Sequence, residues 1–245
     1  EELTFTVRVQ TDGDVRIGTG KLMATSGNSG DELGAPMRLF NGSPAILMVD
    51  DDFTRTDEVL ILSALDDAGK LYDHWDVYKE HGNITPTPAE MGRYDLVLWH
   101  TGWRTNDLLT STDITNLMAY MDMGKGLLLS SQDCLSAISP GTFTSDYLGV
   151  ASWSTEVSAF EGIGVSGDPV TDGMDFVLDY PQPQINRPDD LEPSAIGTVI
   201  LHSEDMDRLA MRADNGTARC VFFAFAMNAM YPAAPDPDNP KVLLD

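Results

Sequence analysis

The pattern of hydrophobic and polar positions changes at about residue 44. Before that point, residues 3–10 alternate between polar and apolar side chains, and residues 15–24 form a second β-like run after the turn sequence TDGD. Residues 25–36 are rich in glycine and serine and predict a loop. We therefore expect residues 1–43 to form a β-hairpin segment, which is either added to the main body or is the tail of a preceding β domain.

After this segment the chain alternates between strand-like and helix-like stretches. Short apolar runs at residues 45–49, 94–100 and 126–131 predict buried parallel strands, and the alternation at 72–78 predicts one more. Strands and helices at this spacing are typical of α/β proteins. We expect residues 44–245 to form a three-layer α/β sandwich with a doubly wound, mostly parallel sheet of flavodoxin-like class.

Three helices are predicted between these strands, and each has a candidate N-cap. Thr56 or Asp57 is expected to begin the first helix. Thr87 is expected to cap the second, with a proline directly after it in the first turn. Thr110 and Asp113 have the spacing of a capping box at the start of the third helix.

The pattern weakens beyond Cys134. Residues 137–150 predict a broken helix, and residues 151–196 predict a long irregular insertion rich in glycine, proline and aspartate. Asn215 and Gly216 predict a two-residue hairpin turn between the last two strands. These final strands are expected at residues 195–203, 207–214 and 218–227.

The net charge excludes some partners. The chain has 39 acidic and 15 basic residues, a net charge of −24, which argues against nucleic acid and anionic membranes as partners. No apolar run approaches the roughly 20 residues of a membrane helix, so we expect no membrane insertion. The acidity favours cation binding or a salty extracellular setting. The chain has two cysteines, Cys134 and Cys220, so one disulfide bond is possible but is not required.

Three consecutive carboxylates, Asp50, Asp51 and Asp52, follow the first buried strand directly. Open parallel sheets bind their ligands at this end of their strands. One interpretation is a Ca²⁺ or Mg²⁺ site, to which Asp133 adds an oxygen, and no other cofactor is expected. The commoner alternative is that Asp51 or Asp52 accepts hydrogen bonds from amides at the next helix N-terminus, with Arg55 neutralising part of the charge.

The loop after the third strand, from His100 to Trp103, faces the same crevice. An imidazole at His100 is a ligand candidate, although a satisfied, half-buried histidine is more common. Trp103 and Trp153 offer stacking surfaces for a sugar, so a glycan or another small molecule is a candidate ligand. The expected ligand-binding set is Asp51, His100, Thr101, Gln132 and Asp133.

The opening sequence ILMVDDD locally resembles the receiver domains of response regulators. In those domains, acidic residues hold magnesium beside a phosphoacceptor aspartate at the end of the third strand. Here the acceptor position falls on His100, and the lysine expected after the fifth strand is not evident in VILHSED. Because metal and acceptor must together neutralise the phosphoryl group, we do not expect phosphotransfer.

A broader resemblance covers roughly residues 45–230. Four segments match, in order and spacing, the motifs LLVDDD, YDVVIW-TG, LFLSGQD and SDYLG, and they are Leu47–Asp52, Tyr94–Gly102, Leu127–Asp133 and Ser145–Gly149. In this respect the chain resembles the class I glutamine amidotransferase-like superfamily, in particular its domains in large secreted or cell-surface bacterial proteins. The resemblance implies that fold, and neighbouring domains of a longer chain as partners.

Catalysis in that superfamily needs a cysteine on a sharp strand-to-helix turn, a histidine, and an acid that orients the histidine. The turn after the fourth strand offers Ser131, or Gln132 if the register slips by one, and Cys134 lies further along. His202 and Glu204 have the His-X-acid spacing of active members. The catalytic candidates are therefore Ser131 or Cys134 with His202 and Glu204. However, the strand that should carry the histidine is better matched by CVFFAFAM, which has none.

We therefore expect a non-catalytic, amidotransferase-like module that contributes binding or scaffolding to an extracellular or cell-surface bacterial protein. The alternative is a hydrolase or amidase that acts at the strand-end crevice, and a third interpretation is a cation-dependent ligand-binding domain. Because the first residue is Glu1 rather than methionine, we expect a mature product or a part of a longer chain.

Overall fold

The chain forms two compact units, Glu1–Ser43 and Pro44–Asp245. The computed structural model describes residues 16–25, 32–41, 44–53, 56–106, 108–182 and 186–231. Within these residues, no helix is both long and apolar enough to cross a membrane.

The first unit contains an antiparallel hairpin of β1 (Arg16–Thr25) and β2 (Glu32–Asn41). The strand predicted at residues 15–24 corresponds to β1. The loop predicted at residues 25–36 was partly wrong, because residues 32–36 belong to β2. Pro36 pairs with Lys21 there. A proline is tolerated because each strand of a two-stranded ribbon is an edge strand. The strand predicted at 3–10 and the turn TDGD lie outside the described residues.

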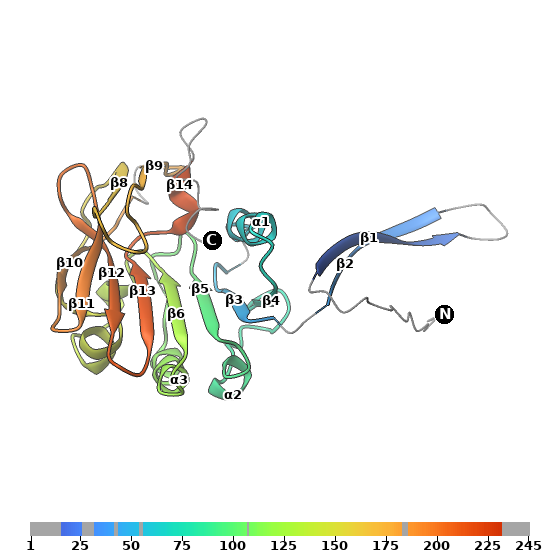
Figure 1. Ribbon diagram of the computed structural model, residues 1–245, viewed down its shortest axis with the longest axis horizontal. Helices are drawn as coiled ribbons and strands as arrows, with labels where there is room; N and C mark the ends of the chain where they lie inside the picture. The colour runs from blue at the N-terminus through green and yellow to red at the C-terminus, as the bar shows by residue number, and fades with distance from the viewer. Residues whose placement is uncertain are drawn as a thin grey trace. The chain divides into compact units, whose positions relative to one another are not determined.

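Among its described residues, the second unit is built on a ten-stranded sheet with the order β14-β9-β8-β11-β12-β13-β6-β5-β3-β4 (Figure 1). The parallel strands are β13 (Arg219–Phe223), β6 (Gly126–Ser130), β5 (Leu96–His100), β3 (Ile46–Asp50) and β4 (Tyr72–Asp76). The antiparallel strands are β14 (Met230–Tyr231), β9 (Asp175–Leu178), β8 (Glu161–Gly164), β11 (Gly197–His202) and β12 (Arg208–Asp214).

Helices cover both faces of the parallel half of this sheet (Figure 1). Leu65 of the first helix packs with Met48 of β3 on one face. Leu117 of the third helix packs with Val49 of β3 on the other face. This arrangement confirms the predicted three-layer α/β sandwich. The helices are α1 (Val59–Asp67), α2 (Pro88–Met91) and α3 (Ser111–Met121), with short helical turns η1 (Cys134–Ala137), η2 (Phe143–Tyr147) and η4 (Met227–Ala229).

The capping predictions hold for two of the three helices. Thr87 caps α2 and Thr110 caps α3, each in a complete capping box. The prediction for α1 was wrong, because its N-cap is Glu58 and no side chain caps it. The carboxylate of Asp57 accepts a hydrogen bond from the amide of Trp103 at 3.4 Å.

The predicted irregular insertion at 151–196 is in fact partly regular. Its strands β8 and β9 extend the main sheet, while β7 (Val150–Ser154) and β10 (Asp190–Pro193) pair with each other. Strands of four or five residues are too short to show a clear alternation. The hairpin after β12 also differs from the prediction, because Asp214 pairs with Arg219 and leaves four residues between them.

Replacing Thr110 with alanine should lower the free energy of unfolding by about 1 kcal/mol. The substitution removes the hydroxyl that accepts from the amide of Asp113 and donates to its carboxylate. Urea unfolding followed by circular dichroism measures the loss.

Thr115→Ala is the matched control, because Thr115 is exposed on the same helix and bonds only the carbonyl of Ser111. Its effect should stay within about 0.5 kcal/mol. Equal losses for the two variants would contradict a specific role of the cap.

Candidate functional site

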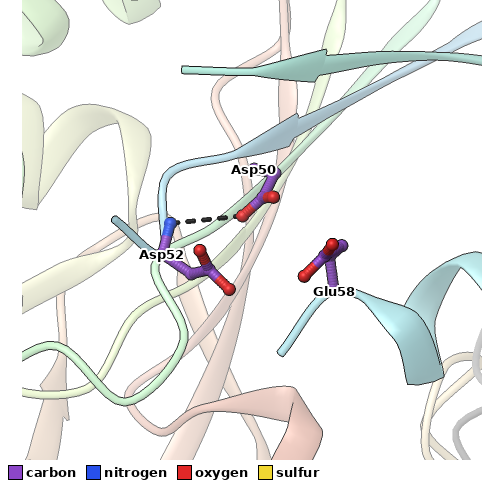
Figure 2. Close-up of side chains that lie close together, drawn as sticks. All are labelled: Asp50, Asp52 and Glu58. Atoms are coloured by element: carbon purple, nitrogen blue, oxygen red, sulfur yellow. Dashed lines mark hydrogen bonds between the residues drawn. The ribbon is translucent and has the colours of Figure 1, made fainter. Parts of the chain in front are cut away.

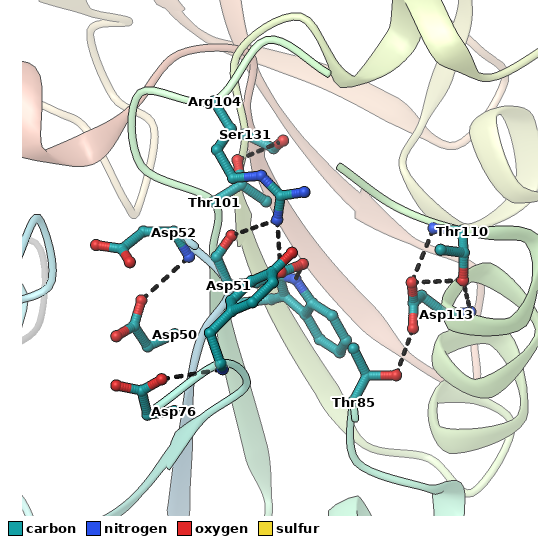
Figure 3. A network of polar contacts seen from close by, with 12 residues as sticks. Asp50, Asp51, Asp52, Asp76, Thr85, Thr101, Arg104, Thr110, Asp113 and Ser131 are labelled. Atoms are coloured by element: carbon teal, nitrogen blue, oxygen red, sulfur yellow. Dashed lines mark hydrogen bonds and ion pairs between the residues drawn. The ribbon is translucent and has the colours of Figure 1, made fainter. Parts of the chain in front are cut away.

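Asp50, Asp51 and Asp52 lie at the point where the strand order of the sheet reverses. The chain leaves β3 for β4 on one side and returns to β5 on the other, and open α/β sheets bind ligands at the carboxyl ends of strands at such a point. Successive side chains of an extended chain alternate between the two faces. Asp50 and Asp52 therefore lie on the α1 side, and Asp51 lies on the side of α2 and α3 (Figures 2 and 3).

Glu58, the N-cap of α1, meets Asp50 and Asp52 on the first of these faces (Figure 2). One carboxylate oxygen from each of the three residues lies within 4.8 Å of the others. All three side chains are buried. Asp50 Oδ1 accepts from the amide of Asp52 at 3.2 Å, and Asp52 Oδ2 accepts from the amide of Asp57 at 3.0 Å.

The second oxygens of this acidic cluster, Asp50 Oδ2, Asp52 Oδ1 and Glu58 Oε2, have no hydrogen-bond partner among the described residues. Two cations lie nearby, but at longer distances. His74 Nε2 is 3.7 Å from Asp50 Oδ2, and Lys79 Nζ is 3.6 Å from Glu58 Oε1. The cluster of Asp50, Asp52 and Glu58 thus has an incomplete set of contacts.

The pKa values reflect this crowding. Burial and then the neighbouring charge of Asp50 raise the pKa of Asp52 to about 7. Burial also acts to raise the pKa of Asp50, but His74 and the amide of Asp52 lower it overall. The same pairing raises the pKa of His74, although burial opposes it. The carboxyl group of Asp50 therefore ionises readily, whereas the ionisation of Asp52 is disfavoured.

His100 lies beside the cluster, because it pairs in register with Asp50 across β5 and β3. The imidazole is fully buried, and neither ring nitrogen has a hydrogen-bond partner within the part of the chain that the structure describes. Burial lowers the pKa of His100 to about 4, so the ring is neutral at physiological pH. The half-buried, satisfied histidine expected from the sequence is not what the structure contains.

Asp51 is the one member of the aspartate run with a complete set of partners (Figure 3). Its Oδ1 accepts from Arg104 at 2.7 Å, its Oδ2 accepts from Trp99 Nε1 at 3.2 Å, and Arg104 also donates to its carbonyl oxygen. Burial raises the pKa of Asp51 to about 7, although Arg104 opposes the shift. Of the three expected metal ligands, Asp50 and Asp52 therefore converge with Glu58, whereas Asp51 lies on the other side of β3.

Two further predictions from the sequence concern the partners of the aspartate run. Asp52 does accept an amide hydrogen bond near the start of α1, as the capping interpretation expected. Arg104 pairs with Asp51, and Arg55, which was expected to neutralise part of the charge, lies outside the described residues. Sequence reasoning missed Glu58, whose only signal was an acidic residue in the turn that follows the aspartates.

The bend after β6 differs from a nucleophile turn. The residue with the left-handed conformation is Asp133 (φ 58°), not Ser131 or Gln132. Ser131 Oγ accepts a hydrogen bond from Thr101 at 2.8 Å, and both residues are fully buried. Asp133 Oδ2 lies 3.7 Å from Arg187. The predicted ligand candidates Thr101, Gln132 and Asp133 are all buried at the carboxyl ends of β5 and β6.

The structure does not bring His202 and Glu204 to this bend. His202 lies on β11, which is separated from β6 by β12 and β13, a spacing of about 14 Å at 4.8 Å per strand. Its Nδ1 faces the carbonyl oxygen of Met206, and Glu204 accepts from the amides of Phe160 and Glu161. These contacts give both residues a role in holding loops together.

Neither cysteine is suited to act as a thiolate nucleophile. Cys134 and Cys220 are buried and unpaired with each other. Burial raises the pKa of both thiols far above the ordinary value. A protonated, inaccessible thiol is not a nucleophile.

Comparison with protein-family models gives no match, and comparison with curated proteins gives none. Among solved structures, a cytoplasmic protein of Salmonella typhimurium is 12% identical over 93% of each chain, with a TM-score of 0.54. A protein from Thermoplasma acidophilum, described as part of a putative GMP synthase, is 8% identical over 82% of this chain and 92% of its own, with a TM-score of 0.53.

A third structure, the exo-β-1,4-mannosidase of the Opitutaceae bacterium strain TAV5, is 13% identical with a TM-score of 0.51. That match covers 77% of this chain and 32% of the mannosidase. At identities this low, the likeness concerns the fold alone. The chain therefore shares an α/β fold with these solved structures, and the fold class predicted from the sequence is confirmed.

Proposed function

We propose that this chain is a non-catalytic binding module that holds a divalent cation, calcium or magnesium, between Asp50, Asp52 and Glu58. The observation that carries the proposal is the convergence of three buried carboxylates, each with an oxygen that has no hydrogen-bond partner within the described residues. Buried carboxylates without partners are costly, and a cation bound between them offsets that cost.

The spacing of the oxygens fits a single ion. Two oxygens that bind one calcium ion at about 2.4 Å lie at most about 4.8 Å apart. The oxygens of Asp50, Asp52 and Glu58 satisfy this limit. Since calcium takes about six to eight oxygen ligands, water or a bound ligand supplies the remainder.

His100, which lies beside Asp50 on the neighbouring strand, supports the same proposal. A neutral imidazole next to Asp50 can accept a hydrogen bond from a water on the ion. A second layer of this kind orients the groups that bind the metal directly. The buried and otherwise unpartnered ring of His100 thereby gains a role.

The bend after β6 supports the proposal of a non-catalytic role. Among the described residues Ser131 has no hydrogen bond to a histidine, because the ring nitrogens of His100 have no partner and His202 lies about three strands away. Cys134 is buried and its thiol remains protonated. An acyl-transfer site needs a nucleophile and a base within hydrogen-bond reach of each other, and the described residues at this bend do not provide the pair.

One observation favours a hydrolase as the second candidate function. Asp189 is fully buried, and burial followed by the charge of Asp133 raises its pKa to about 7. A carboxyl of that pKa is suited to act as a general base. The charge of Asp189 also raises the pKa of the Cys134 thiol, which indicates that Asp189 lies near this thiol. The buried thiol of Cys134 makes this the weaker candidate.

The proposed setting is the surface of a bacterial cell or the extracellular medium, within a longer chain. Two features support it, the sequence motifs shared with domains of secreted bacterial proteins and the net charge of −24. Calcium modules outside the cell bind with dissociation constants of about 10⁻⁴ to 10⁻³ M, which suits a site with only three protein carboxylates.

Calcium should raise the melting temperature of this protein. At a free concentration of about 100 Kd the gain is about 2.7 kcal/mol, or about 5–10 °C for a unit of this size. The Asp50→Asn variant should lose this response, because Asp50 supplies one of the three oxygens. Differential scanning fluorimetry with calcium and then magnesium measures the shift.

Asp179→Asn is the matched control, since Asp179 is exposed and lies at the far end of the sheet, after β9. It should retain the full response to calcium. The proposal fails if the native protein shows no shift with either cation, or if Asp179→Asn loses as much of the shift as Asp50→Asn.

Replacing Asp189 with asparagine should flatten the pH dependence of stability. The folded pKa of Asp189, about 7, exceeds its ordinary value, so the folded protein keeps a proton that the unfolded chain loses at lower pH. Native stability relative to the variant should therefore fall as the pH rises from about 4 to about 8. Urea unfolding across this range tests the sign, and a constant difference would contradict the assignment.

A further inference from the structure

A cavity of about 980 Å³ lies on the other side of β3 from the acidic cluster. The turns that follow β3, β4 and β5 line it, together with the first turns of α3. Its volume is within the range of small-molecule sites. Asp51 lines this cavity, so the cavity and the acidic cluster share a single stretch of backbone.

The charged groups that line the cavity are already engaged by protein partners (Figure 3). Asp51 accepts from Arg104 at 2.7 Å. Asp113 accepts from Thr85 at 2.5 Å and from the hydroxyl of Thr110 at 2.6 Å. A charged ligand would have to disrupt these pairs, and a neutral ligand would not.

The amides of the lining residues are, in contrast, available. Asn83, Asn106 and Asn116 all line the cavity, and within the described ranges no hydrogen bond engages their side chains. Each carboxamide offers two donors and an acceptor with two lone pairs. Three such groups around one cavity can bind several hydroxyl groups of a single ligand.

Aromatic side chains supply the apolar part of the wall. Phe53 and Tyr78 pack edge to face with ring centroids 4.8 Å apart. Phe53 is 55% exposed and has a φ of 78°, which is rare for a bulky residue. Strained backbone of this kind occurs where the fold holds a side chain in a functional position. Here it holds a phenyl ring at the cavity wall and in contact with solvent.

We propose that this cavity binds a neutral, polyhydroxylated ligand, a carbohydrate. Carboxamides match the hydroxyl groups of a sugar in both donor and acceptor roles, and aromatic rings pack against its apolar C–H face. The proposal rests on the binding role given above but not on the cation. Asp50→Asn should therefore leave sugar binding intact even if it removes the response to calcium.

Saturation-transfer difference NMR tests the proposal with neutral tetrasaccharides of glucose, galactose, mannose and N-acetylglucosamine, each at millimolar concentration. At least one should receive saturation from the protein. Phe53→Ala and Asn116→Ala should each weaken its binding about tenfold. Asn116 lies on α3, where alanine is a better helix former than asparagine, so this variant should fold even if Phe53→Ala does not.

Phe160→Ala is the matched control, because Phe160 is 56% exposed and lies next to β8, at the far side of the sheet. It should bind like the native protein. Tetragalacturonate is the charged counterpart and should show no transfer. The proposal is overturned if no neutral tetrasaccharide receives saturation, if only tetragalacturonate does, or if Phe160→Ala weakens binding as much as Phe53→Ala.

Discussion

The burial of three adjacent carboxylates at the end of β3 is the constraint on which the site depends. Because successive side chains of an extended chain point to opposite faces, the run cannot act as one chelating group. Asp51 turns toward a face that supplies Arg104 and the indole of Trp99. Asp50 and Asp52 turn toward a face where the nearest acidic neighbour is Glu58. Protein groups thus balance the negative charge of Asp51. On the other face, Asp50, Asp52 and Glu58 each have an oxygen without a hydrogen-bond partner among the described residues.

This asymmetry assigns different roles to the two sides of the same strand end. On the compensated side, the ion pair of Asp51 and Arg104 fixes the turn after β5 and leaves neutral amides and aromatic rings around the cavity. On the other side, Asp50, Asp52 and Glu58 have oxygens without hydrogen-bond partners among the described residues, and they form the cation site that we propose. Both sides lie at the reversal of strand order, where the turns after β3 and β5 diverge and leave room for ligands.

At the bend after β6, the fold is shared with known proteins but the side chains are not those of a nucleophile turn. The chain shares its α/β fold with the protein from Thermoplasma acidophilum. The left-handed residue at the bend is nevertheless Asp133, which lies near Arg187. Fold alone does not determine function, which depends on the side chains that meet at the site. The binding role that we propose therefore rests on the side chains at the end of β3 and not on the fold.

The sequence by itself determined the elements of the parallel half of the sheet and two of its helix caps. Apolar runs and capping boxes are local patterns, and burial on both faces of β3, β5 and β6 leaves little choice of register. The short strands β8 and β9 could not be predicted, because four residues show no clear period and their pairing is long-range.

The site was decided by the tertiary structure. The sequence placed the aspartates at the right edge of the sheet, but it grouped all three together and omitted Glu58. The distance of His202 from Ser131 likewise depends on two intervening strands. Which side chains meet follows from strand order and from the side of the sheet on which α1 packs, and both are set by contacts between residues far apart in the chain.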